Sequence, residues 1–126
     1  MFISSQAGAE ADGSLQVGIA EGGRVTVIQV AGEVDIATAP RLALALGSHD
    51  PRRALVLDLS RVTFMSSTGV GLIASVRGRL SRHGASLALS GLQPIVVRLL
   101  ETAGLTEALL IASDVPTAVD MLTAQP

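Results

Sequence analysis

Three consecutive hydroxyl side chains, Ser66, Ser67 and Thr68, stand immediately before an apolar run that also contains Gly69 and Gly71. A hydroxyl before a helical pattern can accept a hydrogen bond from a first-turn amide, so Ser66 or Ser67 is a natural helix cap. Capping needs only one hydroxyl. The remaining hydroxyls and the two glycines suit a bound or covalently attached phosphate, because helix N-termini attract anions. The residues alone leave both roles open.

Other reactive chemistry is scarce in this sequence. The chain has no cysteine, and all nine of its basic residues are arginine, which excludes a thiolate nucleophile, a Schiff-base lysine and a phosphate-binding lysine. Its two histidines, His49 and His83, are far apart, and no base adjoins Ser67 or Thr68. An enzyme using either hydroxyl as nucleophile is therefore the least favoured interpretation. We predict no catalytic residue, no metal site and no cofactor.

Composition restricts the partners and the compartment. The chain of 126 residues has a net charge of −2 and lacks Trp and Tyr, so it offers no base-stacking platform and no strongly basic patch for direct nucleic-acid binding. Mean hydropathy is +0.53, yet no segment approaches the roughly 20 uncharged apolar residues needed for membrane insertion. The N-terminus lacks the pattern of a secretory signal. These features predict a cytoplasmic protein.

The hydrophobic pattern predicts an α/β fold in the order β-β-α-β-α-β-α-β-α. Alternating apolar residues indicate an antiparallel N-terminal hairpin, and helical crossovers between later strands require parallel pairing. We expect a flexible leader over 1–13 and a single domain over 14–124, with a mostly parallel four- to five-stranded sheet and about four helices. Thr38 and Asp114 are expected helix caps, and Gly32 is expected to end the second strand of the hairpin.

Two segments follow buried strands of this sheet, residues 32–35 and residues 64–71. Ligands of open α/β sheets gather at the carboxyl ends of the strands, so these segments are the candidate functional loops. Residues 32–40, together with 58–60 and 64–71, resemble the motifs of bacterial anti-sigma-factor antagonists of the STAS class. The resemblance spans about residues 14–122.

The resemblance implies a partner-switching protein with a STAS-like fold. Unphosphorylated, it would bind an anti-sigma factor with kinase activity and so regulate sigma-factor-dependent transcription. Phosphorylation on Ser or Thr by that kinase would release it, and a Ser/Thr phosphatase would reset it. In the family the phosphorylated hydroxyl immediately precedes a glycine, which corresponds to Thr68 before Gly69, with Ser67 as the alternative. Asp35 matches an acidic residue of the first motif, and Ser66 stands where the family has aspartate.

We expect the partner-binding surface to combine these loops with the exposed side of the following helix. Ser75, Arg79 and Arg82 fall on the same side of that helix as Thr68 at 100° per residue. The predicted partner-binding residues are Asp35, Ser66, Ser67, Thr68, Gly69, Ser75, Arg79 and Arg82. The alternative hypothesis is a STAS module that is not phosphorylated and binds a small anionic or lipid-like ligand or another protein, which Ser66 in place of the acid favours.

Overall fold

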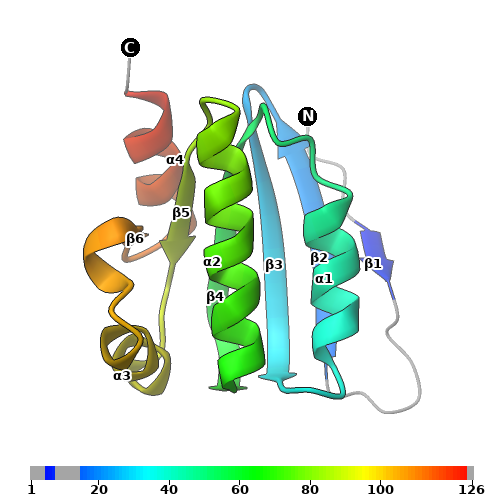
Figure 1. The fold of residues 1–126 in the computed structure, drawn as a ribbon. Coiled ribbons are helices and arrows are strands. Elements are labelled where there is room, and N and C mark those ends of the chain that lie inside the picture. Colours follow the sequence, from blue (N-terminus) through cyan, green and yellow to red (C-terminus); the bar gives the residue numbers. More distant parts are fainter. Residues whose placement is uncertain (1–4, 8–14, 125–126) are drawn as a thin grey trace.

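The computed structural model describes residues 5–7 and 15–124, and its strands form one six-stranded sheet in sequence order (Figure 1). The first three strands are antiparallel neighbours and the remaining pairs are parallel. This confirms the predicted α/β class and the N-terminal hairpin. The strands are β1 (Ser5–Ala7), β2 (Leu15–Gly22), β3 (Val25–Val34), β4 (Ala54–Met65), β5 (Leu87–Ser90) and β6 (Leu110–Ala112).

The sheet has one strand more than the upper limit predicted from the sequence. The extra strand, β1, pairs with β2 and lies within the segment 1–13 that we expected to be a leader. Its three residues are too few to show a hydrophobic alternation, so pairing with β2, and not local pattern, defines it. The other residues of the predicted leader lie outside the described part of the chain.

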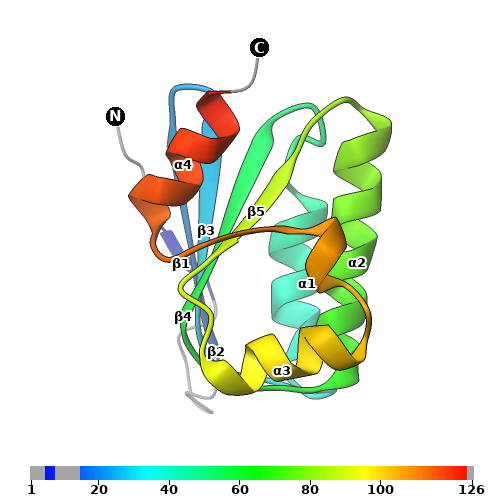
Figure 2. The ribbon, with the colours of Figure 1, turned by 90° about the vertical axis from the view of Figure 1, so that its left-hand side faces the viewer.

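Four α-helices cover the sheet, as predicted, with α1 and α2 on one face and α4 on the other (Figure 2). Leu55, Leu57 and Leu59 of β4 point to the face of α1 and α2, whereas Val56 points to α4. This alternation buries both faces of β4, as parallel strands require. None of the helices in the described ranges is long and apolar enough to cross a bilayer. The helices are α1 (Ala39–Gly47), α2 (Ser67–Arg82), α3 (Pro94–Thr102) and α4 (Val115–Thr123).

Strands β3 and β4 run further than the hydrophobic pattern indicated. Gly32 does not end β3, which continues to Val34, and β4 continues to Met65. Register shifts between Gln29 and Ala31, and between Gly32 and Glu33, mark irregularities in this pairing. An irregular strand loses the strict alternation on which sequence prediction depends, because each extra residue changes the face that the following residues occupy.

Candidate functional site

The two candidate loops leave the sheet side by side. Val34 at the end of β3 pairs with Met65 at the end of β4, and the Ser66 amide donates a 2.8 Å hydrogen bond to the Val34 carbonyl. The loop that leads to α1 and the loop that leads to α2 are thus tied together at their first residues. The two segments, residues 32–35 and 64–71, therefore meet at the carboxyl edge of the sheet.

Ser66 is the N-cap residue of α2, but its side chain does not cap the helix. Its backbone is extended, with φ −92° and ψ 175°, and its carbonyl accepts hydrogen bonds from the Gly69 and Val70 amides. The Ser66 Oγ is buried and has no hydrogen-bond partner in the described structure. Side-chain capping by Ser66, one of the two roles that the residues left open, does not occur in this structure, and α2 begins with uncapped amides.

Ser67 and Thr68 are both exposed in the first turn of α2. Within the described residues, neither hydroxyl has a hydrogen-bond partner, and neither do their backbone amides. No acidic residue lies in the first turn of α2, so no side chain of that turn complements the positive end of the helix dipole. Either hydroxyl can accept a phosphoryl group whose charge stays exposed to solvent. The two free amides can donate hydrogen bonds to that group.

Gly69 fixes how closely α2 approaches the ends of β3 and β4. A Cβ at this position would lie 2.7 Å from Met65 Cγ and 2.9 Å from Val34 Cγ1, both closer than carbon atoms pack. Val34 is fully buried and Met65 nearly so, which leaves them little room to move. Gly69 thus has a packing role: it places Thr68 directly above the two strand ends.

Asp35 lies next to the Thr68 loop, but its carboxylate closes its own turn. The Asp35 Oδ1 accepts hydrogen bonds from the Ala37 amide at 2.9 Å and the Thr38 amide at 3.0 Å, and Asp35 holds no bond to Thr68 in the described structure. The Thr38 hydroxyl donates to the Glu33 carbonyl at 2.7 Å. Thr38 occupies the cap position of α1 without capping it through its side chain, contrary to prediction, because its hydroxyl is already bonded to the Glu33 carbonyl and to the Asp35 amide, the latter at 3.0 Å. Asp114 does cap α4, as predicted.

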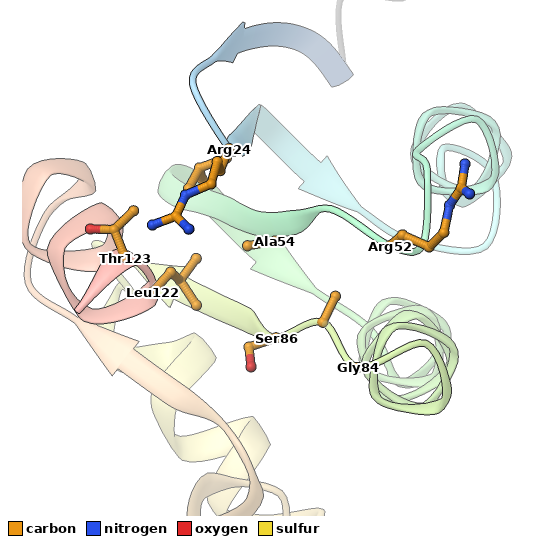
Figure 3. A pocket seen from close by; sticks show the side chains of 9 residues that line it. Arg24, Arg52, Ala54, Gly84, Ser86, Leu122 and Thr123 are labelled. Carbon is orange, nitrogen blue, oxygen red and sulfur yellow. The ribbon is translucent and has the colours of Figure 1, made fainter. Parts of the chain in front are cut away.

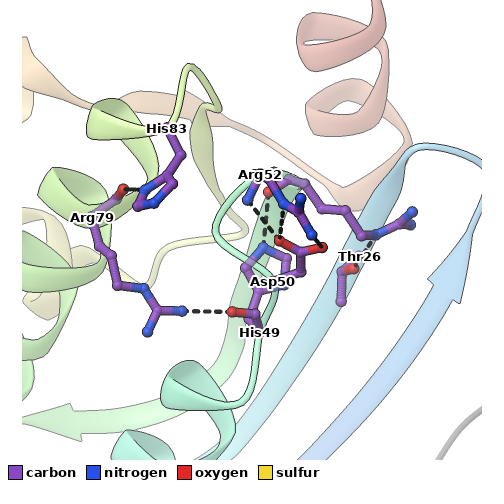
Figure 4. A network of polar contacts seen from close by, with 7 residues as sticks. Thr26, His49, Asp50, Arg52, Arg79 and His83 are labelled. Carbon is purple, nitrogen blue, oxygen red and sulfur yellow. Dashed lines mark hydrogen bonds and ion pairs between the residues drawn. The ribbon is translucent and has the colours of Figure 1, made fainter.

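The three predicted partner residues on α2 differ in their surroundings. Ser75 and Arg82 are exposed, whereas Arg79 is half-buried and its Nη2 donates to the carbonyls of His49 at 2.6 Å and Leu46 at 3.1 Å (Figure 4). Arg79 therefore neutralises the C-terminal end of α1, a structural task. Arg82 lies 14 positions after Thr68, which is ~21 Å along a helix. A partner that touches Thr68 and Ser75 reaches Arg82 only by covering the whole of α2.

Sequence reasoning missed the exposed apolar residues of α1 and of the loop before it. Ile36, in the loop before α1, is 81% exposed, and Leu44 on α1 is 72% exposed. A hollow of about 120 Å³ between α1 and α2 is lined by Ala43, Leu46, Gly47, Leu72, Ser75, Val76 and Arg79. We call Ile36, Leu44, Leu72 and Ser75 the α1–α2 surface. Helical phase was the available signal, because Leu44 falls on the side of α1 opposite Leu42 and Leu46.

The opposite end of the sheet carries a second hollow with a different character. Its volume is about 200 Å³, and Arg24, Arg52, Leu122 and Thr123 are among the residues that line it (Figure 3). The Arg52 Nε forms an ion pair with Asp50 Oδ1 at 3.2 Å. This pairing lowers the pKa of Asp50 and raises that of Arg52. The basic residues at this end are thus partly neutralised and lie far from Thr68.

His49 gives this end of the molecule a pH dependence. Its ring is buried, its Nε2 lies 2.8 Å from the Arg53 carbonyl, and burial lowers its pKa below 6.5. Unfolding restores the ordinary value, so the unfolded chain takes up a proton first as the pH falls. Above pH 6.5, this group should not affect the free energy of unfolding. As the pH decreases from 6.5 to the folded-state pKa, the free energy of unfolding should decrease by at most ~1.4 kcal/mol per pH unit.

Chemical denaturation of the wild type and of His49→Gln between pH 5 and 7.5 measures this effect. The decrease in the free energy of unfolding over this pH range should be smaller in His49→Gln than in the wild type. The matched variant His83→Gln, which removes an exposed histidine, should retain it. Equal slopes for the wild type and His49→Gln would contradict the assignment.

The comparisons with known proteins identify the family of this chain. The sequence model described as the STAS domain matches residues 16–118. An anti-sigma-B factor antagonist of Listeria monocytogenes is 38% identical over 82 residues, which cover 64% of this chain and 72% of that protein. The anti-sigma-F factor antagonist RsfB of Mycobacterium tuberculosis is 35% identical over 71 residues, or 55% of this chain and 58% of RsfB.

Solved structures share the fold. A crystal structure of an anti-sigma factor antagonist from Mycobacterium paratuberculosis has a TM-score of 0.79 and 27% identity, covering 90% of this chain and 98% of that one. SpoIIAA in its unphosphorylated form has a TM-score of 0.74 at 20% identity, covering 87% and 98% of the two chains, which shows likeness of fold. With four-fifths of its residues inside the matched domain, the chain belongs to the STAS domain family.

Proposed function

We propose that this protein is an anti-sigma-factor antagonist controlled by phosphorylation of Thr68. Unmodified, it binds an anti-sigma factor with kinase activity in the cytoplasm and so regulates sigma-factor-dependent transcription. The observation that carries this proposal is the exposed, unpartnered Thr68 hydroxyl at the start of α2, beside the α1–α2 surface. The names of the Listeria and Mycobacterium relatives support the class of partner. The chain acts by binding, and the catalysis belongs to its kinase and to a Ser/Thr phosphatase.

The proposed covalent step is a phosphoryl transfer from ATP. The Thr68 Oγ1 attacks the γ-phosphorus, the bond to the bridging oxygen breaks, ADP leaves, and the hydroxyl proton passes to a base of the kinase. The phosphatase reverses the modification by hydrolysis, which returns the hydroxyl and releases inorganic phosphate. Ser67 is also exposed and is the alternative acceptor.

Charge explains why the phosphate would dissociate the complex without unfolding the domain. A phosphate adds about −1.5 to −2 charges at the N-terminus of α2, where the free amides stabilise an anion. The same charge pressed against a partner over the apolar α1–α2 surface would lose its hydration. Without new cationic contacts, that loss amounts to several kcal/mol, and each ~1.4 kcal/mol weakens binding about tenfold.

Mass spectrometry of the purified protein after incubation with the cognate anti-sigma factor and ATP tests the proposal. We expect a mass increase of one phosphate, mapped to Thr68, that is absent in Thr68→Ala and retained in Ser67→Ala. Phosphate on Ser67 alone would identify Ser67, and not Thr68, as the phosphorylated residue. Stable binding to the anti-sigma factor with no phosphorylation of either residue would favour the unphosphorylated binding module instead.

The α1–α2 surface makes a second prediction about the same complex. Leu44→Asp should weaken binding to the anti-sigma factor by about tenfold, because a carboxylate would be desolvated where an apolar contact is lost. Ile95→Asp is the matched control, since Ile95 is 54% exposed and belongs to α3, which contributes no residue to this surface. Isothermal titration calorimetry should show near wild-type affinity for that control. Equal losses for the two variants would place the interface elsewhere.

A further inference from the structure

The second face of the sheet is only partly covered. Helix α4 packs on Val25, Val27 and Val56, and in Figure 2 it lies over one end of this face. Beyond α4 the same alternation places Gln29 and Asp58 side by side, since they are paired residues of β3 and β4. Polar side chains therefore follow directly after the apolar ones that α4 buries.

A bulge in β4 adds a cation to this face. Leu59 and Val62 both belong to the core on the α1 and α2 side. In a regular strand, one residue separates two neighbours that face the same side. Here two residues, Ser60 and Arg61, lie between them, which is the mark of a bulge. The register confirms the irregularity, because Gln29 pairs with Asp58 whereas Ala31 pairs with Arg61. Bulges often re-aim side chains in this way beside binding sites.

These residues enclose a pocket that is separate from the Thr68 site. Its volume is about 250 Å³, and we call it the open-face pocket. Gly18 and Ala31, which carry little or no side chain, leave the hollow between longer neighbours. The lining residues are Gln16, Gly18, Gln29, Val30, Ala31, Asp58, Ser60 and Arg61.

The polar groups of the open-face pocket are largely unused by the protein. Within the described residues, the side chains of Gln16, Gln29 and Arg61 make no hydrogen bond or ion pair, and Arg61 does not pair with Asp58. Only Oδ1 of Asp58 is engaged, accepting from the Ser60 amide at 3.1 Å and the Ser90 hydroxyl at 3.4 Å. A carboxylate oxygen, a guanidinium and two carboxamides thus remain available around one hollow.

The backbone that carries these groups is held in place. The Gln93 Nε2 donates a 3.0 Å hydrogen bond to the Ser60 carbonyl. Gly91, with φ +69°, lies so close to Ser60 that an added Cβ would be 2.7 Å from the Ser60 Cβ. The loop after β5 thus contacts β4 at the bulge and holds the backbone at Ser60, between Asp58 and Arg61.

We propose that the open-face pocket binds a small zwitterion of the α-amino-acid class. Asp58 would bind the ammonium group and Arg61 the carboxylate, each by a charge-assisted hydrogen bond, while Gln16 and Gln29 would contact a polar side chain. A volume below the ~300–1,000 Å³ usual for drug-sized ligands suits a ligand of this size. The site lies on the face opposite α1 and α2, so this inference stands independently of the phosphorylation proposal.

Saturation-transfer NMR with each of the twenty L-amino acids, added singly at millimolar concentration, tests the proposal. We expect at least one to bind the wild type, and neither its deaminated nor its decarboxylated analogue to do so. Asp58→Asn and Arg61→Gln should each weaken that binding at least tenfold. Arg98→Gln, which removes an exposed arginine on α3, is the matched control and should bind as the wild type does.

Three outcomes would overturn the inference. The first is the absence of binding by all twenty amino acids, and the second is equal binding by an analogue that carries only one of the two charges. The third is unchanged affinity in both pocket variants. Thermal unfolding of each variant separates a lost site from a lost fold, and amide shift changes at Gln29 and Arg61 in the wild type give a readout that needs no variant.

Discussion

Thr68→Glu is expected to weaken binding to the cognate anti-sigma factor at least tenfold, and phosphorylation of Thr68 to weaken it further, by about a hundredfold. The exposed side chain sits at the start of α2, beside the apolar α1–α2 surface that a bound partner would cover. A carboxylate buried there without a cationic contact loses hydration worth ~1.4 kcal/mol or more, and each such amount is one factor of ten in affinity. Calorimetry or surface plasmon resonance measures the change.

Thr68→Gln separates charge from size in this experiment. Glutamine has nearly the shape of glutamate and no charge, so its affinity should stay within about threefold of the wild type. Thermal unfolding provides the second control. A negative charge in the first turn of α2 should leave stability unchanged or raise it by ~0.3–1 kcal/mol, because it complements the helix dipole. Equal affinities for the Glu and Gln variants would show that charge at Thr68 does not control the complex.

Gly69→Ala is expected to lower the free energy of unfolding by ~1–3 kcal/mol, the usual cost of overpacking. The new Cβ would fall 2.7 Å from Met65 Cγ and 2.9 Å from Val34 Cγ1, and Val34 is fully buried. In a helix, alanine is otherwise more favourable than glycine by ~1 kcal/mol. A net loss of stability would therefore show that the steric clash costs more than the gain in helix propensity. Urea denaturation followed by circular dichroism measures it.

Gly71→Ala is the matched variant, two residues further along the same helix turn. A Cβ at Gly71 meets no atom within 4 Å, so only helix propensity acts and stability should rise by ~0.5–1 kcal/mol. The double variant Val34→Ala/Gly69→Ala should lose less stability than the two single losses added together, because the smaller side chain makes room. Similar effects of Gly69→Ala and Gly71→Ala would mean that α2 does not depend on close contact at its start.

The Thr68 and Gly69 predictions concern two consecutive residues with separate tasks. Gly69 sets the distance between α2 and the strand ends, and Thr68 presents its hydroxyl from the position that this distance defines. Ser66 adds a buried Oγ without a partner, which under usual conditions costs ~1–3 kcal/mol. Its neutral side chain also leaves the first turn of α2 without an acid. The start of α2 is therefore arranged for access at some expense of local stability.

Local pattern was sufficient to predict the class of fold and the location of the loops. Apolar alternation from Leu15 and the buried run from Ala54 identified the hairpin and a parallel strand, because side-chain periodicity follows directly from backbone geometry. The hydroxyl run before Gly69 indicated the start of α2 for a similar reason, since helix starts favour such residues. Asp114 was recognised as a cap on the same basis.

Tertiary contacts decided the features that depend on residues distant in sequence. Arg79 looked like a partner residue by helical phase, but the carbonyls at the end of α1 occupy its guanidinium. The Thr38 hydroxyl does not cap α1, because the Glu33 carbonyl and the Asp35 amide occupy it. The extension of β3 and β4 and the bulge that places Arg61 beside Asp58 depend on strand register. The sequence by itself determines side-chain periodicity and local capping tendencies. The hydrogen-bond partners of each polar group are determined only by folding, because they include backbone atoms that are distant in the sequence.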